Sequence, residues 1–415
     1  MAARWWRWPH GCSWRPAARN PGPGCPGRAG SLGPRAAPDG RAQVERKGFP
    51  VSKLIPYCSL VKNLTPAFPN VHSISRFYHT TPAVKTQSGE KYSDPFKLGW
   101  KDLKGLYEDI RKEVFVSTTE LKEMSEYYFD GKGKGFRPII VVLMARACNI
   151  HHNNSRDMQA NQRSIALITE MIHTASLVHD DVIDNARSRR GKHTVNNIWG
   201  EKKAVLAGDL ILSAASVALA RIGNTTVLSI LTEVMEDLVR GEFLQLGSKE
   251  NENERFAHYL EKTFKKTASL IANSCKAVSV LSCPDPEVHE IAYQYGKNVG
   301  IAFQLIDDVL DFTSCSDKMG KPTAADLKLG LATGPVLFAC QQFPEMNAMI
   351  MRRFSFPGDV DRARQYVLQS DGVRQTTYLA QQYCHEAVRE ISKLRASPER
   401  DALIQLSEIV LTRDK

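Results

Sequence analysis

Three aspartates crowd one short segment of the chain, at Asp180, Asp181 and Asp184 in the stretch HDDVIDNARSRRG. On a helix, Asp180 and Asp184 share one face, about 40° apart, whereas Asp181 lies about 100° from Asp180. Like charges at this spacing repel each other, and a divalent cation removes the repulsion. Carboxylate ligands suit Mg²⁺, which is commonly held by carboxylates together with substrate phosphates. The alternative interpretation is a polar helix end with three solvated aspartates.

The same pattern returns 127 residues later in QLIDDVLDF, with Asp307, Asp308 and Asp311. Both triads lie at the ends of long apolar segments. If the two helices face each other, the six carboxylates surround one cavity mouth, which is a site for several metal ions and a highly anionic ligand. The chain has no EF-hand loop, no G-x-x-x-x-G-K-[ST] loop and no G-x-G-x-x-G after a strand, so nucleotide use is unsupported.

The elements that must position these carboxylates are helices. Apolar residues recur at helical spacing in Ser164–Asp184, without interior Gly or Pro. Several of the expected helices are apolar on more than one face, which is typical of helices buried in a large bundle. Strand-like alternation with hairpin turns is not evident. We therefore predict one all-α domain over residues 86–415, built as a bundle of long helices around a central cavity. Further helices are expected at 204–222, 227–247, 259–282 and 287–312.

Residues 1–85 form a separate, basic leader. They carry thirteen Lys and Arg but only two acids, whereas the rest has 42 basic and 43 acidic residues. An Arg-rich, acid-poor start is typical of an organelle transit peptide, and SRFYHTT at 75–81 resembles a mitochondrial processing site. We expect import into the mitochondrial matrix with cleavage near Tyr78; a disordered basic tail is the alternative. The nearly neutral body argues against a nucleic-acid partner.

Cysteine placement and hydropathy further restrict the class of protein. Nine cysteines are scattered without a C-x-x-C pair, mostly inside apolar patterns after the leader. This favours buried thiols in a reducing compartment over disulfides or a zinc site. No unbroken apolar run approaches the length of about 18 residues that spans a membrane. We expect a soluble body whose contact with the inner mitochondrial membrane is at most peripheral.

The paired D-D-x-x-D motifs, the RRG after the first motif and the helical pattern resemble the trans-prenyltransferases, the head-to-tail isoprenyl diphosphate synthases. The resemblance runs from about residue 100 to the C-terminus. It includes a G-G-K-R-x-R-P-like box at 131–138, which departs from the family at Lys132 and Gly135; a later loop departs at Leu331 and Gly334. The likeness is closest to the catalytic subunits of long-chain, mitochondrial members that make decaprenyl diphosphate. The segments GDLIL, GEFLQL, KKTASL, FQLIDD and GKPTAADLKLG also look familial.

The resemblance implies a Mg²⁺-dependent prenyltransferase. Two or three Mg²⁺ ions are implied to bridge the triads and an allylic diphosphate of the farnesyl or geranylgeranyl type, and to help its C–O bond ionise. Isopentenyl diphosphate is implied to bind separately, without metal, and to attack the allylic cation, after which the released diphosphate takes the final proton. The implied metal ligands are Asp180, Asp181, Asp184, Asp307, Asp308 and Asp311. The implied catalytic residues are Asp180, Asp184, Arg189, Lys266 and Asp307.

The two substrates are implied to occupy different sets of side chains. Each side chain also has a plainer interpretation, such as an exposed basic loop for Arg189 and Arg190, a satisfied core histidine for His173, or solvated helix charge for Lys266. The residues implied to bind isopentenyl diphosphate are Lys134, Arg137, His173 and Arg190. Those implied to bind the allylic diphosphate are Arg189, Lys266, Thr267, Gln304 and Lys321.

Two small residues bear on product length. Ala175 and Ser176 precede Asp180 by five and four residues, about 7.5 and 6 Å deeper along the helix. We expect them to line the pocket for the growing tail. Shorter-chain relatives carry bulky aromatic residues there, so small residues imply a long product, the ubiquinone side-chain precursor. The alternative is that they only allow close helix packing.

The resemblance implies a homodimer, or a hetero-oligomer with a homologous subunit. A non-catalytic or regulatory subunit of a prenyltransferase remains an alternative, although such subunits usually lose aspartates or the RRG. A shorter-chain, geranylgeranyl synthase is a second alternative. A terpene cyclase or a squalene-type synthase is a third, and the implied isopentenyl site argues against it.

Overall fold

The computed structural model describes residues 94–114, 118–131, 133, 135–189, 191–247, 252–314 and 324–413. The leader predicted at 1–85, with its cleavage site near Tyr78, lies outside these residues. The described residues form helices and a single two-residue hairpin, which confirms the predicted all-α class. The elements are α2 (Pro95–Leu103), α3 (Leu106–Glu113), α4 (Thr119–Glu126), α5 (Phe136–Asn153), α6 (Ala160–Ile183), β1 (Ser188–Arg189), β2 (Lys192–His193), α7 (Val195–Trp199), α8 (Glu201–Arg221), α9 (Thr225–Leu246), α10 (Glu252–Thr263), the π-helical segment η3 (Phe264–Ala268), α11 (Ser269–Ser282), α12 (Pro286–Thr313), α14 (Ala325–Lys328), α15 (Gly334–Ala339), α16 (Met346–Met351), α17 (Asp359–Gln369), α18 (Gly372–Ile391) and α19 (Pro398–Thr412).

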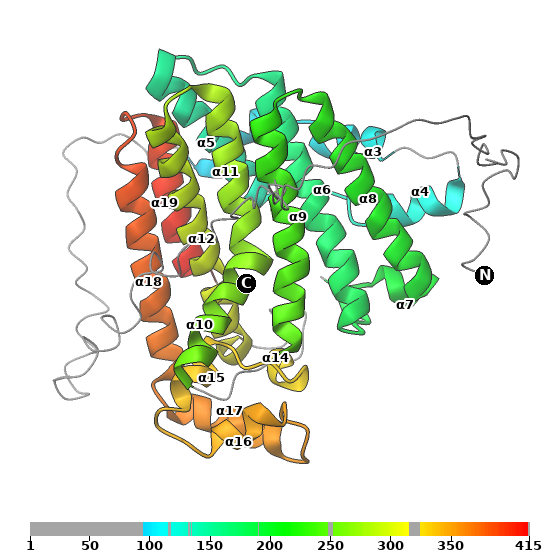
Figure 1. Cartoon of the computed structure of the whole chain (residues 1–415), viewed down its shortest axis with the longest axis vertical. Coiled ribbons are helices and arrows are strands. Elements are labelled where there is room, and N and C mark those ends of the chain that lie inside the picture. The colour runs from blue at the N-terminus through cyan, green and yellow to red at the C-terminus, as the bar shows by residue number, and fades with distance from the viewer. Residues whose placement is uncertain are drawn as a thin grey trace, which may run out of the picture. The chain divides into compact units, whose positions relative to one another are not determined.

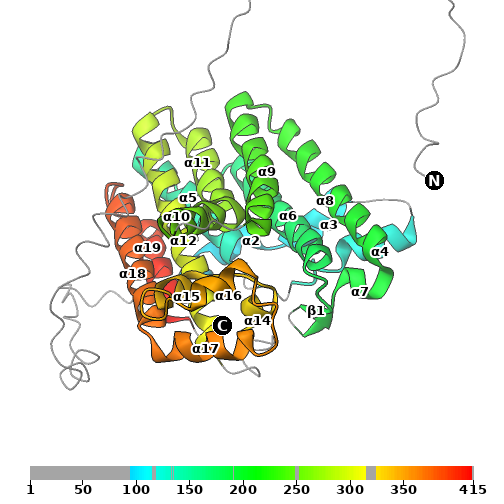
Figure 2. The same cartoon turned by 60° about the horizontal axis from the view of Figure 1, so that its bottom comes forward.

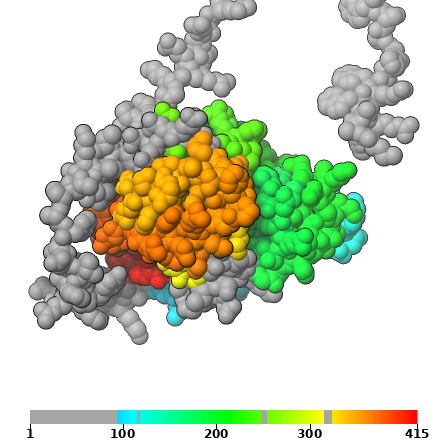
Figure 3. Space-filling model, turned by 90° about the horizontal axis from the view of Figure 1, so that it is seen from below, coloured from blue at the N-terminus to red at the C-terminus, as the bar shows by residue number. Residues whose placement is uncertain are grey.

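The long helices lie side by side, and the short helices α14–α17 gather at one end of them (Figures 1 and 2). Helix α12 packs on α11 and α18, α11 also packs on α5 and α9, and α6 packs on α8. Helices α6 and α12 both run toward the end where α14–α17 lie (Figure 1). From below, the segment with α15–α17 covers this end beside the green surface of the α6–α9 side (Figure 3). The two aspartate triads therefore sit at the same end of the bundle.

Local signals explain where these two helices begin and end. Helix α6 starts at a capping box between Gln159 and Gln162, and Asp184 follows its last residue. Helix α12 starts at Asp285, whose side chain accepts a hydrogen bond from the Glu287 amide, with Pro286 at the first helical position. The predicted helices at 164–184, 204–222, 227–247 and 287–312 match α6, α8, α9 and α12 within a few residues.

Two elements differ from the sequence expectation. The helix expected at 259–282 begins at Glu252 and changes register in the π-helical segment η3, so that it consists of α10, η3 and α11. The hairpin was not expected: Ser188 pairs with His193 and Arg189 with Lys192. Strands of two residues are too short to show alternation, and α11 is buried at nearly every position, so a change of register before it leaves no visible break in the apolar pattern.

Glycines let neighbouring helices approach η3 closely. A Cβ atom on Gly300 of α12 would lie 2.6 Å from Cα of Ala268, and one on Gly241 of α9 would lie 2.8 Å from Cγ of Lys266. One turn before Gly300, a Cβ atom on Gly296 would lie 2.8 Å from Cα of Ala272. Because no side chain fits at these crossings, α9 and α12 hold η3 between them.

Helix α8 has a mixed environment. By length and composition alone it is apolar enough to cross a membrane. The sequence shows no unbroken apolar run of that length here, because Gly208, Asp209 and two serines interrupt it. One side packs on α6. Its other side exposes Leu206 and Val217, so this face is available to another surface.

We expect Gly300→Ala to lower the free energy of unfolding by about 1–3 kcal/mol, although alanine favours helices, because the added methyl group overlaps the backbone at Ala268. Denaturant unfolding measures the change. Ser229→Ala, an exposed position inside α9, is the control and should stay within about 0.5 kcal/mol of the original chain. Equal stability of the Gly300→Ala chain would contradict the close crossing.

Candidate active site

The first triad lies at the C-terminal end of α6. The helix dipole is negative at this end and therefore destabilises three carboxylates. Asp181 is 1% exposed, and its two oxygens accept hydrogen bonds from different partners. Nε and Nη2 of Arg189 both lie 2.8 Å from Oδ1, and the Tyr128 hydroxyl donates to Oδ2 at 2.9 Å. The Asn196 amide donates to the backbone carbonyl of Asp181. Hairpin strand β1 thus brings Arg189 of the RRG segment back onto the first triad.

The second triad lies in the last two turns of α12. Asp308 is 2% exposed and accepts hydrogen bonds from the Tyr259 hydroxyl at 2.5 Å and from Nε2 of Gln304 at 2.9 Å. Asp311 accepts hydrogen bonds from the backbone amides that begin α14, at Ala325 and Asp326. Asp311 therefore has a structural role as well as a place in the triad.

Asp307 contacts the far end of the chain. Its Oδ1 lies 2.8 Å from Nη2 of Arg413, which directly follows α19. The Arg413 guanidinium also stacks over the Phe303 ring, 3.6 Å from its centroid, and its own Nε is buried without a hydrogen-bond partner. No sequence signal marked Arg413, since it stands alone near the C-terminus.

The π-helical segment links the two triads. Nζ of Lys266 lies 3.7 Å from Oδ1 of Asp180 and 2.5 Å from Oε2 of Glu242. The next residue, Thr267, donates a hydrogen bond to Oε1 of Gln304 at 2.8 Å, and Gln304 in turn donates to Asp308. Adjacent residues of η3 therefore reach one triad each. Single turns of π-helix are frequent at functional sites, because the extra residue redirects side chains.

The structure thus brings together three of the five residues predicted for the allylic diphosphate, Lys266, Thr267 and Gln304. The structure also places the guanidinium of Arg189 in hydrogen-bond contact with the carboxylate of Asp181. Sequence reasoning gave no role to Glu242 or Gln245, although both stand in the familial segment GEFLQL; Gln245 accepts a hydrogen bond from Lys266 at 3.2 Å. The predicted residues Lys134, Arg190 and Lys321 lie outside the described residues.

Two residues predicted for isopentenyl diphosphate also meet. Nη1 of Arg137 lies 3.0 Å from Nε2 of His173. The Arg137 guanidinium lies 5.8 Å from the centroid of Phe303, the ring that Arg413 covers. Phe303 therefore connects the arginine–histidine pair to the second triad, one turn along α12 from Asp307.

The two residues predicted to set product length lie deeper on α6. Ala175 is fully buried, whereas Ser176 is half-buried and donates its hydroxyl to the carbonyl of His173 at 2.9 Å. This bond satisfies the serine hydroxyl within its own helix. Both positions stay small and can face an apolar environment without an unpaired polar group.

Burial alters the acidity of the triads. Burial raises the pKa of Asp180 to about 6, and the nearby Glu242 adds to this shift while Lys266 opposes it. Burial raises the pKa of Asp308 to about 7, with a further contribution from Asp326. Both carboxylates are short of positive charge, and their hard oxygen donors fit a divalent cation, which would keep them ionised.

Within the described part of the chain, no three His, Cys, Asp or Glu side chains are drawn together closely enough to hold a metal ion. Instead Asp181, Asp307 and Asp308 each have a protein partner from another element. That all six carboxylates surround one cavity mouth stays a prediction.

Comparison with known proteins identifies the family of the chain. The family profile "Polyprenyl synthetase" matches residues 118–367. The chain is 86% identical over 416 residues to the all trans-polyprenyl-diphosphate synthase of Homo sapiens, covering all of both chains. It is 43% identical over 339 residues to decaprenyl-diphosphate synthase subunit 1 of Schizosaccharomyces pombe, covering 76% of this chain and 90% of the relative.

A solved structure has the same fold. The polyprenyl synthase of Caulobacter crescentus, crystallised in complex with calcium and isoprenyl diphosphate, superposes with a TM-score of 0.71 at 30% identity. The match covers 80% of this chain and all of the other. The chain therefore belongs to the polyprenyl synthetase family.

Proposed function

We infer that the chain is a long-chain polyprenyl diphosphate synthase of mitochondria, which extends an allylic diphosphate head to tail with isopentenyl diphosphate. One structural observation supports this inference: Lys266 of η3 lies beside Asp180 of the first triad, and Thr267 reaches Asp308 of the second triad through Gln304. The relatives support the activity and the compartment, since two of them are named mitochondrial synthases of long prenyl chains, from Oryza sativa and Neurospora crassa. The product we propose is decaprenyl diphosphate, the precursor of a ubiquinone side chain.

The proposed domain organisation separates targeting from chemistry. Residues 1–85 would be the transit peptide, removed near Tyr78, and 86–415 the catalytic domain. The composition of the leader supports this division.

The proposed allylic site consists of the triads and the cations between them. Arg189, Lys266, Thr267, Gln304 and Lys321 would bind the diphosphate, and the six aspartates would hold two or three Mg²⁺ ions. When bound, Mg²⁺ supplies Lewis-acid stabilisation of the leaving diphosphate. Lys266 would neutralise charge at Asp180 and at the substrate, because it lies beside both Asp180 and Glu242. The raised pKa of Asp180 and of Asp308 supports a site built for added positive charge.

The proposed isopentenyl site consists of Lys134, Arg137, His173 and Arg190. A planar arginine fork matches a diphosphate group, and the short distance between Arg137 and His173 supports their joint use. Phe303 would hold this site next to the second triad, so that the double bond of isopentenyl diphosphate lies near the allylic carbon. Such alignment lowers the barrier of a bimolecular step. The buried residues of the surrounding helices would help to keep water away from the allylic cation.

The exposed apolar surface of α8 and α9 supports an oligomer, with a second copy or a homologous subunit as partner. Phe243 is 72% exposed and Leu206 is 61% exposed, and Ser216 of α8 contacts Met235 of α9. Apolar surface of this kind commonly marks a protein interface. The word "subunit" in the name of the S. pombe relative suits a heteromeric enzyme. Peripheral contact with the inner membrane stays a prediction.

We expect Asp180→Ala to lower kcat by at least about 10²–10³, because losing one group that stabilises transition-state charge already costs this much. Asp307→Ala should behave likewise. Turnover is measured with isopentenyl and farnesyl diphosphates at saturating Mg²⁺. Asp361→Ala, exposed in the first turn of α17, is the control and should keep normal activity. Near-normal turnover of Asp180→Ala would rule out the assignment.

Arg137→Lys should raise the KM for isopentenyl diphosphate by at least about tenfold and leave the allylic KM nearly unchanged, because lysine cannot replace the two-pronged contact. Initial rates with each substrate varied in turn separate the two constants. Arg240→Lys changes an exposed arginine paired with Glu236 and should alter neither. A change confined to the allylic KM would show that the two sites are exchanged.

Ser176→Phe should keep the first condensations and shorten the product to a few five-carbon units, because the ring would block the tail path one turn below Asp180. Mass spectrometry of the products gives their length. The same substitution at Ser164, half-buried near the start of α6, is the control. An active Ser176→Phe chain with unchanged product lengths would mean that the tail runs elsewhere.

A further inference from the structure

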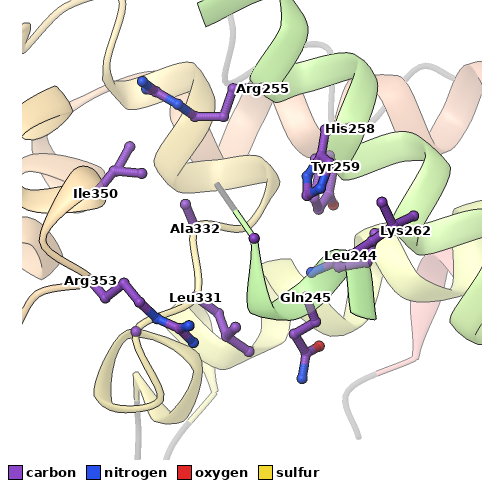
Figure 4. A pocket seen from close by; sticks show the side chains of 12 residues that line it. Leu244, Gln245, Arg255, His258, Tyr259, Lys262, Leu331, Ala332, Ile350 and Arg353 are labelled. Atoms are coloured by element: carbon purple, nitrogen blue, oxygen red, sulfur yellow. The ribbon is translucent and has the colours of Figure 1, made fainter. Parts of the chain in front are cut away.

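A pocket lies beside the second triad, between the end of α9, helix α10, the loop after α14 and the residues that follow α16 (Figure 4). Four of its lining side chains can carry positive charge, and among the described residues no carboxylate lines it. These four are Arg255, His258, Lys262 and Arg353. A pocket of this composition is suited to an anion.

Lys262 is the least compensated of these cations. Its ammonium lies 5.5 Å from the Tyr259 ring, and it forms no ion pair with any carboxylate in the described ranges. Burial lowers the pKa of Lys262, and the more distant Asp308 and Asp326 oppose the shift only in part. A half-buried ammonium without a close counter-ion gains most from an anionic ligand.

Arg353 faces the pocket from the opposite wall. Its guanidinium points toward Leu331 in Figure 4. Its Nη1 and Nη2 donate to neutral carbonyls, those of Leu246 at 3.3 Å and Leu329 at 3.5 Å. The backbone of Arg353 is left-handed, with φ of 55°, a costly conformation for a residue other than glycine. Arg255 differs, because its Nη1 donates to Asn347 at 2.6 Å.

The pocket shares two walls with the active site. Gln245 lines the pocket and accepts a hydrogen bond from Lys266, and Tyr259 lines it and donates to Asp308. Along the continuous helix of α10 and η3, His258, Lys262 and Lys266 follow one another at intervals of four residues. They form a row of side chains that can carry positive charge, the row of cations, which leads from the proposed allylic site into the pocket.

We propose that this pocket binds inorganic diphosphate, the product released by each condensation, between Lys262, His258 and Arg353. The proposal rests on the proposed function, because that reaction supplies the diphosphate next to Lys266. Two linked phosphoryl groups can contact a lysine and an arginine fork on opposite walls at once, whereas orthophosphate reaches fewer cations. The row of cations gives the leaving diphosphate a path that avoids the prenyl tail.

The test is a calorimetric titration of the full chain with inorganic diphosphate in EDTA, so that metal-dependent binding at the triads is absent. Arg137→Met is the background, because it removes the other proposed metal-free diphosphate site. In this background Lys262→Met and Arg353→Gln should each weaken binding by about tenfold or more, the effect of losing one charge-assisted hydrogen bond. Lys262→Arg should restore most of the affinity. Lys101→Met, exposed on α2, is the matched control and should change nothing.

Further titrations with other ligands identify what the pocket binds. Inorganic diphosphate should bind at least about ten times more tightly than orthophosphate, because it makes at least one more charged contact, and farnesyl diphosphate should not displace it. Unchanged affinity in both Lys262→Met and Arg353→Gln would overturn the proposal, as would displacement by farnesyl diphosphate at equal affinity. If Lys262→Met does not fold, as judged by its melting curve, Arg353→Gln decides. The titration does not depend on turnover, so the two proposals fail separately. If the chain makes polyprenyl diphosphate but the pocket variants bind diphosphate normally, only the pocket proposal is refuted. If the chain binds diphosphate in the pocket but makes no product, only the proposed synthase activity is refuted.

Discussion

The burial of like charge at the ends of two helices is the constraint on which the rest of this structure depends. Asp181, Asp308 and Asp311 are at most 5% exposed, and they lie where the helix dipoles of α6 and α12 are already negative. Carboxylates in such a place are stable only if cations and hydrogen-bond donors surround them. The elements packed around the triads supply these cations and hydrogen-bond donors.

The donors come from distant parts of the chain. The hairpin returns Arg189 to Asp181, the residue after α19 brings Arg413 to Asp307, and the start of α14 offers its amides to Asp311. Compensation is incomplete at Asp180 and Asp308, whose pKa values are raised by burial. Under the proposed function, the remaining shortage of positive charge would let the site take metal ions and, with them, a diphosphate substrate.

The π-helical segment sets the distance between the two halves of the site. Gly241 of α9 and Gly300 of α12 approach its backbone from two neighbouring helices, so η3 has little freedom to shift. Its register change places Lys266 toward the first triad and Thr267 toward Gln304 and the second. In a regular α-helix, consecutive side chains point about 100° apart. The extra residue of the π-helical turn changes these directions locally. Packing around these two glycines thus sets where the side chains of the candidate site lie.

The sequence by itself determined the all-α class, the long helices at 164–184 and 287–312, the two aspartate triads and the use of Lys266, Thr267, Gln304, Arg137 and His173 as candidates. The class, the helices and the triads follow from periodicity and motif spacing, which are local properties of the chain, whereas the other candidates follow from the resemblance to the trans-prenyltransferases. The sequence did not reveal the hairpin, the π-helical register or the partners Tyr128, Tyr259, Glu242 and Arg413. Tyr259 and Asp308 are 49 residues apart in sequence, and Asp307 and Arg413 are farther apart still, so no local pattern could pair them. Only the packing of α10, α12 and α19 decided these contacts, because which faces of the helices meet depends on the whole bundle and on the glycines that let them approach.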